Sequence, residues 1–162
     1  MELPAVAVSQ SPEAKFREYL ASRPRPQRFT EQQRDMVQFI FSQHHHFDAD
    51  ELFDDMKRAG LGVSRATVYR TLNKLVDAGL LRRLELGPRM FYEHDYGYPQ
   101  HEHMRCEQCG KMIEFQSPAI EATLREVCRQ HQFHATGHTF VLRGTCAECN
   151  RARMTKRRLD LV

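Results

Sequence analysis

The sequence lacks any apolar run long enough to cross a membrane, although 41% of its 162 residues are hydrophobic. A membrane-spanning helix needs about 20 consecutive apolar residues, so we expect no membrane partner. The N-terminus also lacks the charged start and apolar stretch of a secretory signal. We therefore expect a cytoplasmic protein in a reducing compartment, where paired cysteines bind metal more often than they form disulfides.

The sequence also has little net charge and lacks the H-E-x-x-H pattern of zinc peptidases. A net charge of +3 permits a nucleic-acid partner but does not indicate one. Without a helix that presents two histidines and a general base, we expect neither an enzyme nor a small organic substrate. The alternative from this class is a zinc hydrolase that uses His101, His103 and a carboxylate around a water molecule.

Four of the five cysteines form two C-x-x-C pairs. Cys106 and Cys109 make the first pair, and Cys146 and Cys149 follow after a gap of 36 residues. Redox dithiols usually occur as one pair, whereas two pairs match the four thiolates of a tetrahedral structural zinc site. The fifth cysteine, Cys128, lies alone in a helical pattern and predicts a small core residue.

Nine histidines are many for this length, and most of them occur in clusters. His101 and His103 alternate along an expected strand immediately before the first cysteine pair, so both side chains can face one side. Imidazole groups arranged in this way can bind a second metal of borderline character. The sequence therefore predicts an exchangeable metal site beside a permanent zinc site.

The first 93 residues predict a tail, four helices and two strands. Residues 1–12 show no periodic pattern and predict a disordered tail. A short helix is expected at residues 13–21, and a second starts after the capping box of Thr30 and Gln33. A third starts near Asp48 and ends at the glycines 60 and 62.

The fourth expected helix, residues 65–78, has one apolar face and one polar face. Ser64 is its expected N-cap, and Gly79 ends it. Guanidinium groups can read guanine edges, and hydroxyl groups or rings can contact thymine or phosphate. The alternative is a solvated basic face without a partner. The polar face carries Arg65, Thr67, Tyr69, Arg70 and Lys74.

Two expected strands follow this helix, at residues 80–86 and 89–93, joined by a turn at Gly87 and Pro88. Helices followed by a hairpin describe a winged helix-turn-helix, whose reading helix enters the major groove of DNA. The wing candidates for phosphate contacts are Arg82, Arg83 and Arg89. On this pattern we expect double-stranded DNA as a partner.

Several stretches together resemble the ferric uptake regulator family of bacterial metal-dependent repressors. They are S-R-A-T-V-Y-R-T-L-N-K-L-V-D-A-G-L-L, F-Y-E, H-E-H-M-R-C-E-Q-C-G-K-M-I-E-F and the closing C-A-E-C. The resemblance begins at about Arg28 and covers most of the chain beyond it. It implies an α+β fold, in which an N-terminal winged helix-turn-helix domain precedes a small C-terminal α/β dimerisation domain with a four-cysteine zinc site.

The expected domain boundaries combine this resemblance with the sequence patterns. The winged-helix domain spans residues 13–93, a hinge spans 94–100, and the dimerisation and metal-binding domain spans 101–150. Within that last domain we expect strands at residues 112–115 and 139–142, and a helix from Pro118 to about His131 with Ile120, Leu124 and Val127 facing inward. Residues 151–162 predict a basic, disordered tail.

The resemblance also implies the metal ligands. It places structural Zn²⁺ on the four paired cysteines. It places a regulatory metal on His46, Glu93, His103 and Glu114, with His101 close by as a further candidate, although the run of histidines at 44–46 leaves open which one of them binds. A possible third site matches Glu102, Glu121 and His138, with Gln100 where the family often has histidine. Nitrogen and oxygen ligands favour Fe²⁺ at the regulatory site, with Mn²⁺ or Zn²⁺ as alternatives.

The function implied by the resemblance is metal-dependent repression. A homodimer would bind a palindromic operator when the regulatory site is loaded, and Fe²⁺-dependent control of iron uptake is the first expectation. The matching DNA-binding residues are Arg28, Arg65, Thr67, Tyr69 and Arg70, whereas Gln33 stands where the family usually has arginine. The alternatives within the family are zinc, manganese or peroxide sensing, the last through oxidation of a ligand such as His46.

Overall fold

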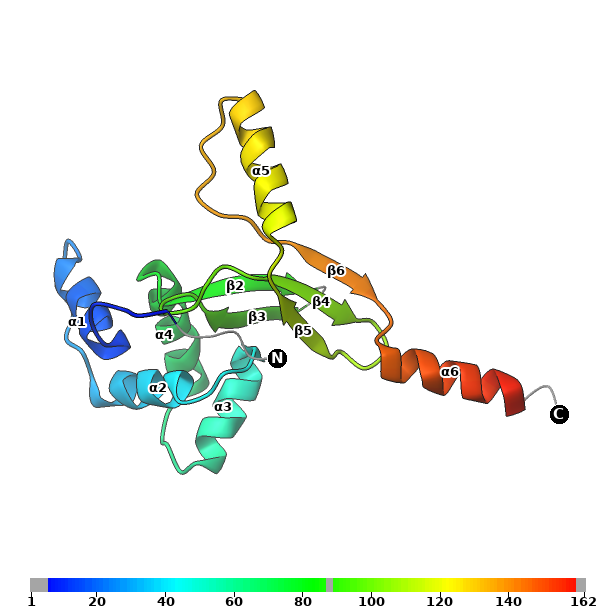
Figure 1. Ribbon diagram of the computed structural model, residues 1–162. Helices are drawn as coiled ribbons and strands as arrows, with labels where there is room; N and C mark the ends of the chain where they lie inside the picture. Colours follow the sequence, from blue (N-terminus) through cyan, green and yellow to red (C-terminus); the bar gives the residue numbers. More distant parts are fainter. Residues whose placement is uncertain (1–5, 87–88, 160–162) are drawn as a thin grey trace. The chain divides into compact units, whose positions relative to one another are not determined.

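The computed structural model describes residues 6–86 and 89–159 (Figure 1). These residues divide into two compact units that part between Pro99 and Gln100, within the expected hinge. Among the described helices, none combines the length and the apolarity that crossing a lipid bilayer requires.

The N-terminal unit consists of four helices and a small antiparallel sheet. Two-residue β1 pairs with β3, and β3 pairs with β2, so β3 is the central strand. The expected winged helix-turn-helix is thereby confirmed; the turn at Gly87 and Pro88 lies outside the described residues. The elements are α1 (Pro12–Ser22), α2 (Glu31–Phe41), β1 (Phe47–Asp48), α3 (Ala49–Arg58), α4 (Arg65–Asp77), β2 (Leu81–Leu86) and β3 (Arg89–His94).

Local capping determines where these helices begin. The Thr30 side chain accepts from the backbone N–H of Gln33, and the Gln33 side chain accepts from that of Thr30, which completes the predicted capping box. Asp48 and Glu51 form a second box at the start of α3. Ser64 caps α4, and the chain leaves that helix through a glycine, residue 79, at a φ of +64°, a conformation that glycine adopts without strain.

One hydrophobic core joins the elements of this unit. In Figure 1, α1–α4 lie together beside the β2–β3 hairpin, and the core takes side chains from each of these helices and from the sheet. Burial of apolar side chains is the main favourable contribution to folding, so this core sets the position of α4. Its largest fully buried side chains are Phe16, Leu20, Met36, Ile40, Met56, Leu72, Leu75, Leu80 and Leu81.

The structure differs from the expectation for residues 1–12. Residues 1–5 lie outside the described residues, but Val6 N–H donates to the Gly97 carbonyl at 2.8 Å. The Tyr96 hydroxyl donates to the Gln10 carbonyl at 3.1 Å, and α1 already begins at Pro12. The bond between Tyr96 and Gln10 joins residues that are 86 positions apart, so local periodicity carried no signal for it.

The C-terminal unit contains a three-stranded sheet in the order β5-β4-β6. β4 and β5 form an antiparallel hairpin, whereas β4 and β6 are parallel. Parallel strands need a crossover connection, and the chain makes it through α5. The elements are β4 (Glu102–Cys106), β5 (Met112–Phe115), α5 (Pro118–Gln130), β6 (Val141–Gly144) and α6 (Ala147–Leu159).

Strand register separates the two faces of this sheet. Met104 lies opposite Ile113 on one side and Leu142 on the other, so the three form an apolar row across the strands. Their exposed fractions are 37%, 38% and 47%. In Figure 1 neither α5 nor α6 covers the sheet, which leaves this row open in the single chain.

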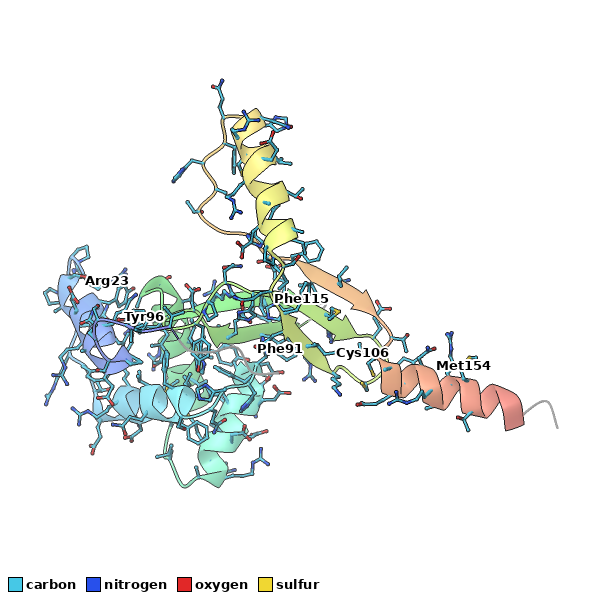
Figure 2. The ribbon with its side chains drawn as sticks, in the orientation of Figure 1. Arg23, Phe91, Tyr96, Cys106, Phe115 and Met154 are labelled. Atoms are coloured by element: carbon cyan, nitrogen blue, oxygen red, sulfur yellow. The ribbon has the colours of Figure 1, made fainter. Side chains whose placement is uncertain are left out.

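Two expectations about the helices of this unit are wrong. The expected inward face of α5 is not fully buried, because Ile120 and Leu124 are only half-buried and Val127 is 46% exposed. The expected disordered tail from residue 151 is instead helical as far as Leu159, as part of α6. Figure 2 shows Cys106 beside the first turn of α6 and Met154 farther along it.

Truncating the core side of α4 should destabilise the N-terminal unit. Leu72 is fully buried, so Leu72→Ala is expected to cost about 2–5 kcal/mol of unfolding free energy, measured by urea unfolding. Arg70→Ala, on the exposed face of the same helix, is the matched control and should stay within about 0.5 kcal/mol. Equal losses in both variants would contradict this orientation of α4.

Candidate metal sites and nucleic-acid interface

The four paired cysteines come together at one end of the C-terminal sheet. Cys106 ends β4, Cys109 lies in the following turn, Cys146 precedes α6 and Cys149 lies in its first turn. Their sulfur atoms all lie within 4.8 Å of one another. Four thiols at this separation fit a tetrahedral zinc ion, as the spacing predicted.

Backbone donors make these thiols unequal. The backbone N–H of Cys146, 3.3 Å from the Cys106 sulfur, and the N–H groups of the turn after β4 lower the pKa of Cys106 to about 6. Thiol hydrogen bonds with Cys109 and Cys146 raise the pKa of Cys149 to about 12. Cys106 therefore loses its proton most readily, and Cys149 keeps its proton most strongly. A metal that binds all four sulfurs must release protons.

In the N-terminal unit, His46 and Glu93 form a pair of potential ligands. The His46 Nε2–H donates to Glu93 Oε2 at 2.7 Å. Glu93 lies on β3 directly opposite Arg82 of β2, and Arg82 Nε–H donates to its other oxygen, Oε1. The sequence did not predict the contact between Arg82 and Glu93, because Arg82 was expected to contact DNA phosphate from the wing.

The neighbouring histidines have different partners. His44 is hydrogen-bonded through Nδ1 to the Tyr98 hydroxyl. His94 stacks on Phe41 and Tyr98, at 4.7 and 5.0 Å between ring centroids, and donates to the Ile40 carbonyl. Burial lowers the pKa of His94 to about 4, although the bond to Ile40 favours its charged form. Of the residues 44–46, His46 is thus the one whose contact is with Glu93.

In the C-terminal unit, His101, His103 and Glu114 form a second group of potential ligands. His103 lies directly opposite Glu114 in the β4–β5 ladder. The rings of His101 and His103 lie 4.8 Å apart, and His101 Nε2 is 3.9 Å from Glu114 Oε1. Since alternate residues share a face, this group lies on the face opposite Met104, as the alternation of the two histidines predicted.

The residues of the expected third site are only partly together. His138 Nε2 lies 3.1 and 3.3 Å from the two oxygens of Glu102. Gln100, at the position where histidine was expected, donates to the His138 carbonyl at 3.3 Å. Glu121 instead pairs with Arg125 at 3.4 Å. Glu121 also lines a hollow of about 500 Å³ together with Gln100, His138 and Cys128. Cys128 is half-buried there, so the expectation that it is a core residue is wrong.

The polar face of α4 is exposed as expected, but its residues differ in their contacts. Tyr69 is 45% exposed, and Arg70 is exposed while its Nε–H donates to the Ala66 carbonyl at 3.1 Å. Arg65 pairs with Asp50 of α3, and its guanidinium lies 4.5 Å above the Phe53 ring. Arg65 therefore also holds α4 against α3.

The remaining candidates for DNA contact lie at other positions of this unit. Thr67, at the N-terminal end of α4, is hydrogen-bonded to the capping side chain of Ser64 at 2.9 Å. Arg28, just before α2, is exposed and lines a surface hollow at the start of that helix. Arg83 donates to Asn73, and Arg89 donates to Asp48 at 3.0 Å. Both of these wing arginines therefore have partners within the unit.

Comparison with known proteins identifies the family. The sequence model of the ferric uptake regulator family matches residues 25–143, a range that includes the first cysteine pair and ends just before the second. The chain belongs to the ferric uptake regulator family. Its members are metal-responsive transcription regulators. Such a regulator needs both a DNA-binding domain and metal ligands, which the winged helix and the ligand groups provide.

Named relatives include both iron and peroxide regulators. The chain is 34% identical over 125 residues to the ferric uptake regulation protein of Campylobacter jejuni, covering 76% of this chain and 80% of the relative. It is 31% identical over 122 residues to the peroxide-responsive repressor PerR of Staphylococcus aureus, covering 75% and 82%. The solved Helicobacter pylori ferric uptake regulator, described with three functional metal-binding sites, has a TM-score of 0.73 and 25% identity, covering 87% and 95%.

Loss of one paired cysteine should remove zinc and destabilise the C-terminal unit. Coordination contributes about 10–16 kcal/mol in small structural zinc sites, and α5 buries no side chain that could compensate. Cys146→Ser is therefore expected to lose bound zinc and to lower the unfolding temperature. Cys128→Ser, outside the cluster, is the control and should keep the zinc. Metal analysis and thermal unfolding decide, and a fully stable Cys146→Ser protein would contradict the prediction.

Proposed function

We propose that this regulator is a cytoplasmic, Fe²⁺-dependent repressor of iron uptake. In this proposal a homodimer binds a palindromic operator when a metal joins the ligand groups of the two units. The observation that carries it is the occurrence of two nitrogen- and oxygen-donor groups on either side of the hinge. One is His46 with Glu93, and the other is His101, His103 and Glu114.

Chain connectivity supports a shared regulatory metal. Glu93 lies near the end of β3 and His101 immediately precedes β4, so only seven residues separate the two ligand groups in sequence. A segment of this length can bring both groups to one ion. The ligand set holds imidazole and carboxylate without thiolate, which suits Fe²⁺ and also Mn²⁺.

Binding of such an ion would couple metal level to DNA affinity. Without metal, the two reading helices of a dimer sample many separations, whereas an operator requires its half-sites at a fixed spacing. An ion that takes ligands from both units binds a restricted set of interdomain angles more tightly. It therefore shifts the population towards the DNA-competent state, with a coupling of about 1–3 kcal/mol.

A second copy of the chain would cover the open face of the C-terminal sheet. The row of Met104, Ile113 and Leu142 is exposed and needs an apolar partner, and the exposed Val127 and Phe133 add to the apolar surface of the unit. In this proposal zinc on the four cysteines holds the unit in the form that dimerises.

The direct test is fluorescence anisotropy of a labelled palindromic duplex, selected from random DNA with Mn²⁺-loaded protein. Zinc-replete protein should bind it only after Fe²⁺, Mn²⁺ or Co²⁺ is added without oxygen. His103→Ala should abolish the metal response and keep the structural zinc. The control is His131→Ala, since His131 lies outside both ligand groups at the end of α5. Tight binding without added metal would contradict the proposal.

The same assay tests the reading face of α4. Arg70→Ala should weaken binding by about 1–3 kcal/mol and relax sequence preference, as expected for a lost base contact. Arg65→Ala should cost less affinity, because Asp50 and Phe53 already occupy its guanidinium. A larger loss in Arg65→Ala than in Arg70→Ala would contradict the proposed docking of α4.

The alternatives within the family differ in the metal and its chemistry. The resemblance to PerR keeps peroxide sensing as a second candidate. Metal-catalysed oxidation would then add oxygen to a ligand such as His46, and peptide mass spectrometry after peroxide treatment of the Fe²⁺-loaded protein would detect it. Zinc-dependent hydrolysis of a substrate through His101 and His103 is the remaining candidate. Esterase or phosphatase turnover that is lost in His103→Ala would support it.

A further inference from the structure

Both carboxylate oxygens of Glu93 have partners within the N-terminal unit. Glu93 Oε2 accepts from His46 Nε2–H at 2.7 Å, and Oε1 accepts from Arg82 Nε–H. The Arg82 contact follows from strand register, because Arg82 and Glu93 are directly opposite residues of the antiparallel β2–β3 pair. The guanidinium is therefore placed on Glu93 by the backbone of the wing itself.

A guanidinium at this position opposes a metal ion. Arginine stays protonated at all ordinary pH values and has no lone pair to donate to a metal. A divalent ion held by Glu93 would share this carboxylate with Arg82, so the two positive charges would repel each other. Chelation of the ion by both oxygens would also require the oxygen that Arg82 now occupies.

We propose that Arg82 is an internal competitor for Glu93 that sets the metal concentration at which the regulator loads. This inference rests on the proposed role of Glu93 as a regulatory ligand. While the metal is scarce, the Arg82 guanidinium neutralises the Glu93 carboxylate. Metal loading would require Arg82 to release its Nε–H from Glu93 Oε1, and the cost of that release would lower the apparent metal affinity.

The sign of the effect distinguishes this role from ordinary ligand support. Outer partners of metal ligands usually strengthen binding, so that removing them weakens the metal affinity. A cationic partner withdraws charge from the ligand oxygen, and its removal should strengthen metal binding. Arg83, the neighbour of Arg82 on β2, donates to Asn73 and not to a proposed metal ligand. Removing Arg83 should therefore leave metal affinity unchanged.

Cobalt binding tests the competition without DNA. Co²⁺ is titrated into zinc-replete protein against a chelator of known affinity, and its visible absorption reports the occupied site. Arg82→Gln is expected to lower the Kd by about tenfold, equivalent to about 1.4 kcal/mol. Arg83→Gln, the matched control, should change it by less than about twofold. Unchanged or weaker Co²⁺ binding in Arg82→Gln overturns the inference.

Two further measurements separate the possible failures. Glu93→Gln should lose the Co²⁺ absorption; if the absorption persists, the proposed regulatory site fails and the inference with it. If Glu93→Gln behaves as expected but Arg82→Gln does not, only the inference fails. In the wild-type protein, the ¹⁵Nε resonance of Arg82 should shift on metal loading while that of Arg83 stays constant. An unchanged Arg82 resonance overturns the inference even if Arg82→Gln does not fold.

Discussion

The carboxylate of Glu93 joins two segments of the N-terminal unit, the wing and the segment that precedes β1. Its strand, β3, is central in the sheet and pairs with β1, which leads into α3, and with β2, which follows α4. Its oxygens bind His46, from the segment before β1, and Arg82 from the wing. In the proposed mechanism, an arginine is exchanged there for a metal ion.

The C-terminal unit depends on a different constraint. Its sheet has three short strands, no residue of α5 is buried, and an apolar row remains exposed. Folding such a unit by apolar burial within one chain would be unfavourable, since small cores rarely offset conformational entropy. The four sulfurs connect the end of β4 to the start of α6 across the whole α5 crossover. Zinc on the cysteines and, in the proposed homodimer, a second subunit would add to the stability of this unit.

Much of this organisation could be predicted from the sequence because its signals are local. The cysteine spacing predicted the cluster, capping residues predicted the starts of α2 and α4, and alternation predicted that His101 and His103 share a face. Pairings between distant segments carried no such signal. The contact between Arg82 and Glu93 depends on hairpin register, and that between Arg65 and Asp50 depends on how α3 packs on α4. The apolar residues of α5 were expected to face inward because a helical stripe indicates a buried face, but the stripe does not say which chain covers it. The basic run after residue 150 was expected to be disordered from its charge, yet its residues are good helix formers and the helix begins at the cysteine cluster.

Cobalt absorption of two single variants tests most directly whether one metal ion takes ligands from both units. His46 belongs to the N-terminal unit and His103 to the C-terminal unit. We predict that His46→Ala and His103→Ala each abolish the same Co²⁺ absorption while the structural zinc remains. Full Co²⁺ absorption in His46→Ala, together with its loss in His103→Ala, would place the site within the C-terminal unit alone and contradict a shared ion.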